Sequence, residues 1–225
     1  MSDVARLPGA VIFDLDGVLV DAEVWWDEVR LAWAGQVGRS WTAADQAAVM
    51  GANSLGWARI MRQRLDLDLS PEQIVDDIVG AMVQRYATHG APLIPGAVAA
   101  VRRLAEAGVP IAVASSSHRL VIDAALDSLG IAGLFRVVVA SDEVAHGKPA
   151  PDVYLLAARE LGVDPSSCLV VEDSLNGVLA ARAAGMTVAL VPNAAVPPAV
   201  GAREAASMIL DSLAGLNPLP KLTVA

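Results

Sequence analysis

The stretch VIFDLDGVLVD, residues 11–21, combines a run of apolar residues with three aspartates. Two of them, Asp14 and Asp16, are one residue apart, where the apolar run gives way to a glycine. Neighbouring carboxylates in a largely buried segment are costly to ionise unless a cation compensates them or one of them keeps its proton. The stretch therefore predicts a buried strand that ends at a site for positive charge.

Further apolar, β-rich runs follow this stretch, and helical patterns fill the intervals between them. The expected strands are residues 10–16, 109–115, 135–141, 168–173, 186–192 and, with a weaker pattern, 207–212. The expected helices between them are residues 96–108, 118–130, 152–162 and 174–185. Strands that are apolar throughout suit a parallel sheet with helices on both faces. The alternation predicts an α/β fold with a doubly wound, parallel-sheet, Rossmann-like core.

One interval, residues 22–90, breaks this rhythm. It has no good strand pattern, several helical patterns and all five tryptophans of the chain. Ser70 followed by Pro71 is typical of a helix start. We expect an inserted all-helical cap domain over residues 22–90, with the core formed by residues 1–21 and 91–225. The simplest role for the tryptophans is the core of the insert itself.

The composition limits the class of protein. A chain of 225 residues, 55% hydrophobic, can form one core domain plus a smaller insert. The formal net charge of −9 is the wrong sign for a nucleic-acid binder. A single cysteine, Cys168, excludes an internal disulfide and a thiolate metal cage. Since no segment has the pattern of a signal peptide or a membrane span, we expect a soluble cytoplasmic protein without membrane contacts.

The ends of the predicted strands carry the polar residues of interest. In open parallel sheets, ligands bind at the carboxyl ends of the strands. These ends hold two acids at the first strand, a serine cluster at the second, a lysine after the third and two acids at the fourth: Asp14, Asp16, Ser115, Ser116, Ser117, Lys148, Glu172 and Asp173. We expect these side chains to form one site. The acids suit a hard divalent cation, Mg²⁺ above all, because that ion prefers oxygen ligands and often shares them with a phosphate.

Lysine is scarce in this chain, which singles out the one near the predicted site. Of the 16 lysine and arginine residues, only two are lysines, Lys148 and Lys221. Lys221 lies close to the C-terminal end of the sequence. A compact ammonium at the mouth of a strand is well placed to hold a phosphate.

Four segments in order resemble one known family. They are DLDGVLVD (14–21), a serine after an apolar strand (115), GKPAPD (147–152) and VVEDSLNGV (170–178). Together, and over essentially the whole chain, they resemble the haloacid dehalogenase-like superfamily. The spacing and the helical insert are similar to its β-phosphoglucomutase/phosphatase branch.

The resemblance implies a role for each matching residue. Asp14 would be the nucleophile that forms an aspartyl phosphate, and Asp16 would be the general acid and then the base. Ser115 and Lys148 would hold the phosphoryl oxygens. Mg²⁺ would be bound by Asp14, the backbone carbonyl of Asp16 and Asp173, with Glu172 close by or acting through water.

The implied function is a Mg²⁺-dependent phosphatase acting on a small phosphomonoester, a sugar phosphate or a similar metabolite. Its partner would be this phosphorylated metabolite, and the protein would be a monomer or a homodimer. Halide-releasing relatives use neither a Mg²⁺ site nor the second aspartate, which is present here as Asp16. Phosphonate-cleaving relatives need a lysine in the insert, and residues 22–90 contain none.

Two alternatives remain. A β-phosphoglucomutase-type enzyme would carry a histidine where this chain has Trp26 and an arginine where, counting from Gly51, it has Ser54. Both departures favour a phosphatase over a mutase. A receiver-like phosphorylation module would also combine acids, a hydroxyl and a lysine, but the insert and the DLDG turn argue against it.

Substrate contacts are expected from the serine cluster and from the insert. Ser116, Ser117 and His118 follow the second strand, and Arg59 is near the presumed mouth of the insert. The alternative for Arg59 is a solvated helix face with salt bridges, and for His118 an incidental position in a first helical turn.

Overall fold

A six-stranded parallel sheet forms the centre of the molecule in this computed structural model, which describes residues 7–193, 197–217 and 219–222. In sheet order the strands are β3 (Val137–Val139), β2 (Ile111–Ala114), β1 (Ala10–Phe13), β4 (Cys168–Glu172), β5 (Thr187–Leu190) and β6 (Met208–Ile209). Every strand predicted from the sequence is present, although each is shorter than its apolar run. The parallel sheet confirms the predicted α/β class.

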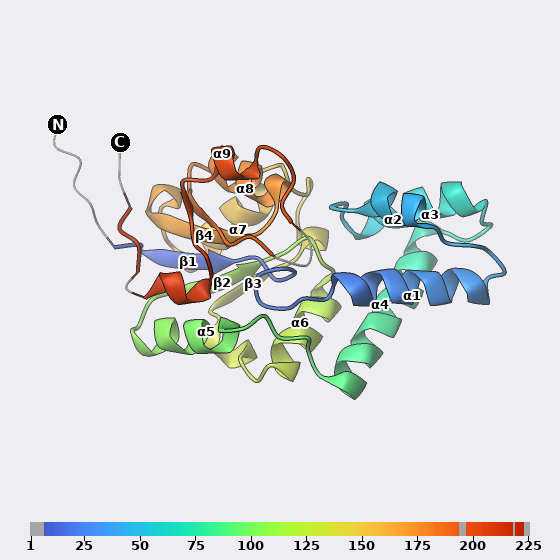
Figure 1. The fold of residues 1–225 in the computed structure, drawn as a ribbon, viewed down its shortest axis with the longest axis horizontal. Helices are drawn as coiled ribbons and strands as arrows, with labels where there is room; N and C mark the ends of the chain where they lie inside the picture. Colours follow the sequence, from blue (N-terminus) through green and yellow to red (C-terminus); the bar gives the residue numbers. More distant parts are fainter. Residues whose placement is uncertain (1–6, 194–196, 218, 223–225) are drawn as a thin grey trace.

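The sheet is covered by helices on both faces (Figure 1). Helices α5 (Ala97–Glu106) and α6 (Arg119–Ser128) pack on one face, where Val11 and Phe13 of β1 belong to the same apolar cluster. Helices α7 (Asp152–Leu161) and α8 (Leu175–Ala183) pack on the other, with Ala10 and Ile12. Successive residues of β1 thus alternate between two buried faces. The predicted doubly wound arrangement is confirmed.

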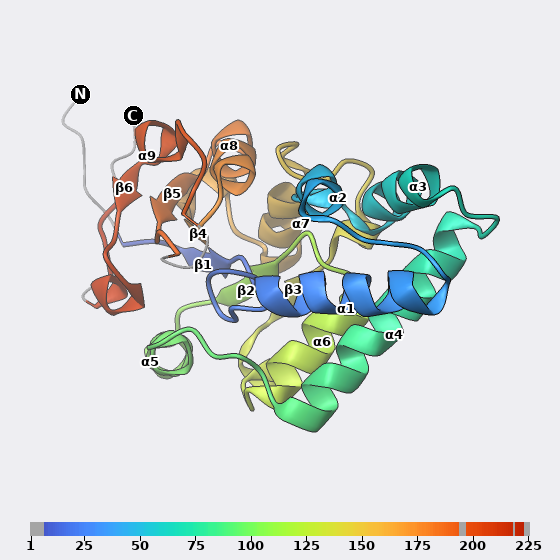
Figure 2. The ribbon, with the colours of Figure 1, turned by 45° about the vertical axis from the view of Figure 1, so that its right-hand side comes forward.

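Four helices lie within residues 22–90, between β1 and α5. They are α1 (Glu23–Gln36), α2 (Ala43–Val49), α3 (Ser54–Leu65) and α4 (Pro71–His89). They lie on the side of the sheet to which β1 points, and α4 runs beside α6 (Figures 1 and 2). The predicted start of α4 is correct: the Ser70 side chain accepts a hydrogen bond from the Gln73 amide, and Pro71 occupies the first turn.

The apolar core of the insert is continuous with one face of the sheet. Trp26, Trp33, Trp41 and Trp57 are buried in the same cluster as Phe13, and Trp25 packs against it half-buried. The tryptophans therefore supply core, as expected, but this core is shared with the α5–α6 face of the sheet and does not stand apart from it. Such continuity holds the insert against the end of the sheet where the predicted site lies.

The remaining elements are short. They are the 3₁₀ turns η1 (Ala132–Leu134), η2 (Ser141–Glu143), η3 (Pro165–Ser167) and η4 (Leu213–Leu216) and the helix α9 (Ala202–Ala205). Among the described residues, no helix is both long enough and apolar enough to cross a bilayer.

Candidate active site

A tight turn after β1 places the first acids. The Asp14 amide donates to the Val171 carbonyl of β4 at 3.0 Å, so the strand pairing with β4 continues up to Asp14. The chain then turns at Gly17, whose φ of +81° favours glycine. A side chain there would also displace Asp173, because a Cβ would lie 1.9 Å from one of its carboxylate oxygens. Gly17 thus lets the Asp14 turn approach Asp173.

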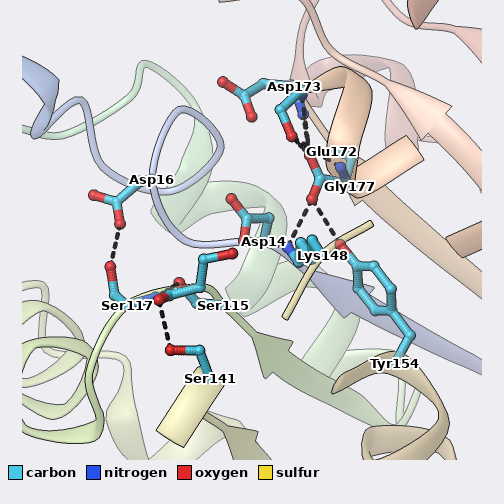
Figure 3. A network of polar contacts seen from close by, with 12 residues as sticks. Asp14, Asp16, Ser115, Ser117, Ser141, Lys148, Tyr154, Glu172, Asp173 and Gly177 are labelled. Carbon is cyan, nitrogen blue, oxygen red and sulfur yellow. Dashed lines mark hydrogen bonds and ion pairs between the residues drawn. The ribbon is translucent and has the colours of Figure 1, made fainter. Parts of the chain in front are cut away.

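Lys148 joins two acids from neighbouring strands (Figure 3). Its Nζ donates to Asp14 Oδ1 and to Glu172 Oε1, both at 2.7 Å. The Tyr154 hydroxyl donates to the same Glu172 oxygen at 2.7 Å, and the ammonium lies 4.8 Å from the centre of the Tyr154 ring. Burial opposes the charge on Lys148, but the two carboxylates outweigh it and raise the pKa of the lysine.

The other carboxylate oxygen of Glu172 is held by the start of α8. Oε2 accepts from the amides of Asp173 and Ser174, each at 3.0 Å, and from the Ser174 hydroxyl at 2.9 Å. Gly177, in the first turn of α8, makes room for this carboxylate, since a Cβ there would lie 1.6 Å from Oε1. Glu172 is fully buried. Burial raises its pKa, but the contact with Lys148 prevails, and the pKa of Glu172 is lowered overall.

The serine cluster after β2 faces Asp16. The Ser117 hydroxyl donates to Asp16 Oδ2 at 2.7 Å, while the Ser117 amide donates to the Ser115 hydroxyl oxygen at 3.1 Å. Asp16 Oδ1 is buried without a hydrogen-bond partner in the described chain. The Asp16 carboxylate thus points away from Asp14, toward the serines (Figure 3). The Ser116 carbonyl accepts from the Ser141 hydroxyl, which ties this loop to the end of β3.

The acids at this site are crowded. Burial, and then the neighbouring Glu172 and Asp14, raises the pKa of Asp173 to about 9. Burial also raises the pKa of Asp14 to about 7, in spite of Lys148. Burial raises the pKa of Asp16 as well, although the hydrogen bond from Ser117 opposes this. One ammonium is therefore too little positive charge for this group of carboxylates.

The donor set fits a hard divalent cation. Oxygen atoms from Asp14, Glu172 and Asp173 all lie within 4.8 Å of one another. Glu172 already accepts from five protein donors, whereas no side chain among the described residues donates to Asp173. Asp14 and Asp173 are therefore the carboxylates with oxygen atoms to spare. Oxygen-only ligation by carboxylates suits Mg²⁺ better than a softer ion.

A cavity of about 360 Å³ lies between the sheet and the insert. From the core it is lined by Asp14, Asp16, Ser115, Ser116, Ser117 and Lys148, together with Asp173 and the start of α8. From the insert, Trp26, Arg30 and Trp57 and the segment 49–52 close it. All the core residues predicted from the sequence, apart from the fully buried Glu172 and the more distant His118, therefore lie at one cavity.

Two predicted substrate contacts lie elsewhere. Arg59 lines a separate hollow with Arg62, on the insert between α3 and α4. His118 caps the N-terminus of α6, where its Nδ1 accepts from the Leu120 amide, and its Nε2 is 3.7 Å from a carboxylate oxygen of Asp142. His118 therefore fits the alternative of an incidental position at the start of a helix. Arg59 fits the alternative of a solvated helix face.

Sequence reasoning missed two residues at the site. Tyr154 falls within an apolar helical pattern, and nothing in that pattern signals its bond to Glu172. Arg30 follows Trp26 by four residues on α1, so that both side chains share one face of the helix. The sequence shows this spacing, but it does not show that this face of α1 turns toward the cavity.

The comparisons with known proteins agree with one another. The family model for haloacid dehalogenase-like hydrolases matches residues 8–185. The fructose-1-phosphate phosphatase YqaB of Escherichia coli is 35% identical over 179 residues, which cover 78% of this chain and 92% of that protein. The bifunctional riboflavin kinase/FMN phosphatase of Arabidopsis thaliana is 31% identical over 212 residues, or 92% of this chain, which spans only 54% of that longer protein.

A solved structure shows the same fold. The crystal structure of CbbY from Rhodobacter sphaeroides in complex with phosphate superposes with a TM-score of 0.83 at 27% sequence identity. The match covers 93% of this chain and 96% of that one.

Proposed function

The chain belongs to the haloacid dehalogenase-like hydrolases, and from that premise we propose that it hydrolyses a small phosphomonoester through a covalent intermediate on Asp14. The observation that carries the proposal is the meeting of a carboxylate nucleophile, a second carboxylate, a hydroxyl and an ammonium at one cavity. A cavity of about 360 Å³ suits a substrate of metabolite size. The similarity to a fructose-1-phosphate phosphatase supports a sugar phosphate or a related compound.

Asp14 is the proposed nucleophile. One of its oxygens is held by Lys148 at 2.7 Å, which leaves the other free to attack phosphorus. Attack forms an aspartyl phosphate and breaks the bond to the substrate oxygen, and water then cleaves the aspartyl phosphate and regenerates Asp14. Lys148 donates to this carboxylate, Ser115 lines the same cavity, and both would stabilise the phosphoryl oxygens.

Asp16 is the proposed proton carrier. It would donate a proton to the leaving alcohol and later accept one from the attacking water. Burial raises its pKa, which favours a carboxyl that can carry a proton. The hydrogen bond from Ser117 holds one oxygen of this carboxylate, and Trp26 also interacts with it, so that the carboxyl group is fixed at the cavity.

Asp14 and Asp173 would hold the divalent cation, with the Asp16 backbone carbonyl as the third predicted ligand. When bound, Mg²⁺ would neutralise charge on the phosphoryl group and reduce its repulsion from Asp14. Glu172 would contribute its negative charge and position Lys148, because its oxygens are already engaged by five donors.

We also propose that residues 22–90 act as a cap over a core formed by residues 1–21 and 91–225. The insert closes the cavity on the side opposite the strand ends, with Trp26, Trp57 and the segment 49–52. Such a wall excludes water from the reacting group while the cap is closed. The mutase alternative is disfavoured because Trp26, which lines the cavity where that enzyme type has a histidine, cannot exchange protons as a histidine does.

The test is phosphate release by the purified full-length protein from a panel of sugar phosphates, phosphoglycolate and nucleotides. We expect release with Mg²⁺ and none with EDTA. Asp14→Asn is expected to abolish release and Asp16→Asn to slow it by about 10²–10⁴-fold. Asp68→Asn, which removes an exposed acid of the insert, is the matched control and should change nothing.

Three outcomes would count against the proposal. Phosphate release that persists in Asp14→Asn would contradict the assignment of Asp14 as the nucleophile. Absence of phosphate release from every compound would contradict the proposed phosphatase activity. Conversion of β-glucose 1-phosphate to glucose 6-phosphate faster than phosphate release would establish the mutase instead.

A further inference from the structure

Arg30 is a buried cation on the cap side of the cavity. Its side chain is only 6% exposed although the residue lines the cavity. The guanidinium carbon lies 5.0 Å from the centre of the Trp26 ring and 5.4 Å from that of Trp57. Contact with two aromatic faces favours the cation and fixes its position. Arg30 is thus held in place before any ligand arrives.

The hydrogen-bonding capacity of this guanidinium is largely unused. Nη1 donates to Gln46 at 3.2 Å, and Nε is buried without a partner. No carboxylate of the described residues lies within ion-pair distance of it, since the ion pairs of the insert arginines involve Arg64 and Arg85. Burial lowers the pKa of Arg30 to about 10, so the group is still charged at neutral pH. A rigid, charged and under-used donor at a cavity is suited to a ligand group.

Glu23 faces the same cavity with the opposite charge. It lies two turns before Arg30 on α1 and is half-buried. The two charges attract each other through space, and no direct hydrogen bond joins them. The cavity wall of the cap therefore offers one acceptor and one donor that are not bonded to each other.

The charges around the cavity decide what this pair can bind. The carboxylates around the cavity outnumber its cations. Asp14, Asp16, Glu23 and Asp173 line it with Lys148 and Arg30, and Lys148 is already paired with the buried Glu172. The proposed divalent cation and a phosphomonoester dianion carry opposite charges of equal size, so together they do not change this excess. A second anionic group would have to settle beside Glu23, whose like charge repels it. An uncharged group that both donates and accepts hydrogen bonds meets no such repulsion.

We propose that Arg30 and Glu23 form a specificity subsite for the uncharged, hydroxyl-bearing end of the substrate, and that they select against a second anionic group there. Arg30 donates to a hydroxyl oxygen, and a hydroxyl proton is donated to Glu23. This inference rests on the proposed phosphatase function, whose substrate it narrows to monophosphates of polyols and sugars.

The test compares sorbitol 6-phosphate with 6-phosphogluconate, which differ at the far end of the same carbon chain by a hydroxymethyl group against a carboxylate. We expect kcat/KM to be at least about tenfold higher for sorbitol 6-phosphate. Arg30→Gln should lower kcat/KM for sorbitol 6-phosphate about 10- to 100-fold, chiefly through KM, as loss of a charged donor predicts. Methyl phosphate is too short to reach the subsite, so the wild-type protein and Arg30→Gln should hydrolyse it equally well.

Glu23→Gln is the second arm and removes the repulsion. We expect it to lower kcat/KM for sorbitol 6-phosphate and to raise kcat/KM for 6-phosphogluconate, so that the ratio of the two values falls. This half-buried residue also keeps the test valid if circular dichroism shows that Arg30→Gln is misfolded. Arg39→Gln, an exposed arginine of the insert, is the matched control and should keep the preference.

A separate measurement distinguishes failure of this inference from failure of the proposed function. Calorimetric titration of Asp14→Asn with the two compounds in Mg²⁺ reports the preference without turnover. Equal or tighter binding of 6-phosphogluconate would overturn the subsite, as would an equal loss of methyl phosphate hydrolysis in Arg30→Gln. A loss of preference in Arg59→Gln instead would assign the subsite to the separate hollow on the insert. Absence of phosphate release together with the expected binding preference would overturn the hydrolysis alone.

Discussion

At the scale of single residues, the site depends on a few positions where space is as important as chemistry. Gly17 and Gly177 carry no functional group, yet each lies where a methyl group would collide with a carboxylate of the site. Glu172 can be buried as an anion because Lys148, Tyr154 and the start of α8 supply five donors to it. The positions of Asp14 and Lys148, on which the proposed chemistry depends, therefore also rely on two glycines without functional groups.

Gly177→Ala tests this reliance. Its Cβ would lie 1.6 Å from Glu172 Oε1, so the carboxylate must move and Lys148 with it. A displacement of about 1 Å in a catalytic group can cost on the order of 10²-fold in rate, and overpacking costs about 1–3 kcal/mol of stability. We expect kcat for phosphate release and the free energy of unfolding to fall by these amounts.

Gly35→Ala on α1 is the control, because a Cβ there meets nothing within 4 Å. It should leave kcat unchanged and stabilise the protein by up to about 1 kcal/mol, since alanine is the better helix former. Wild-type kcat in Gly177→Ala would show that the position of Glu172 does not matter for turnover.

At the scale of elements, local signals place the helices and tertiary packing decides their use. The capping box formed by Ser70 and Gln73, and the proline after Ser70, define the start of α4. The buried residues Ile74, Ile78 and Met82 then place one face of α4 against the apolar cluster shared with the sheet. The insert thus has its own helix signals, but its packing belongs partly to the core.

Ser70→Ala should separate stability from activity. Loss of the side-chain cap costs about 1 kcal/mol, which corresponds to a fall in Tm of about 2–4 °C in a protein of this size. Ser70 does not line the cavity, so kcat and KM should not change. Thermal unfolding and phosphate-release kinetics measure the two quantities.

Gly80→Ala, on the same helix and free of clashes, should change Tm in the opposite direction. A Ser70→Ala protein with normal Tm but altered KM would mean that the start of α4 acts on the substrate cavity rather than on the fold.

At the scale of the whole molecule, the crowded acids link the stability of the cation-free protein to pH. The pKa of Asp173 is about 9 when folded and near 3.8 when unfolded, and that of Asp14 is about 7. Between pH 5 and 9 the folded state thus retains protons that the unfolded state has lost, and stability falls as pH rises. Glu172, whose folded pKa is lowered, contributes oppositely but only below its unfolded value of 4.5.

We therefore expect Tm in EDTA to fall from pH 5 to pH 9 and the increase in Tm caused by Mg²⁺ to grow over the same range. The cation binds the ionised carboxylates and so stabilises the folded state more as protons leave. Differential scanning fluorimetry with and without Mg²⁺ measures both trends. In Asp173→Asn both should flatten, and a Mg²⁺ effect that is independent of pH or persists in this variant would contradict the assignment.

The amino-acid pattern predicted the fold class, which the structure confirms, and it also predicted a helical insert and a group of candidate site residues. Apolar runs without polar interruption can only be buried on both faces, and the carboxyl ends of parallel strands meet at one edge, so Asp14, Ser115, Lys148 and Asp173 had to lie near one another. Which side chains of the insert reach that edge depends on the folded arrangement of the helices. Arg30 faces the cavity while Arg59 does not, because the rotation of each helix depends on packing against distant residues. The engagement of Glu172 by Tyr154 also depended on α7 lying against the sheet, a contact between segments far apart in the chain that no local pattern records.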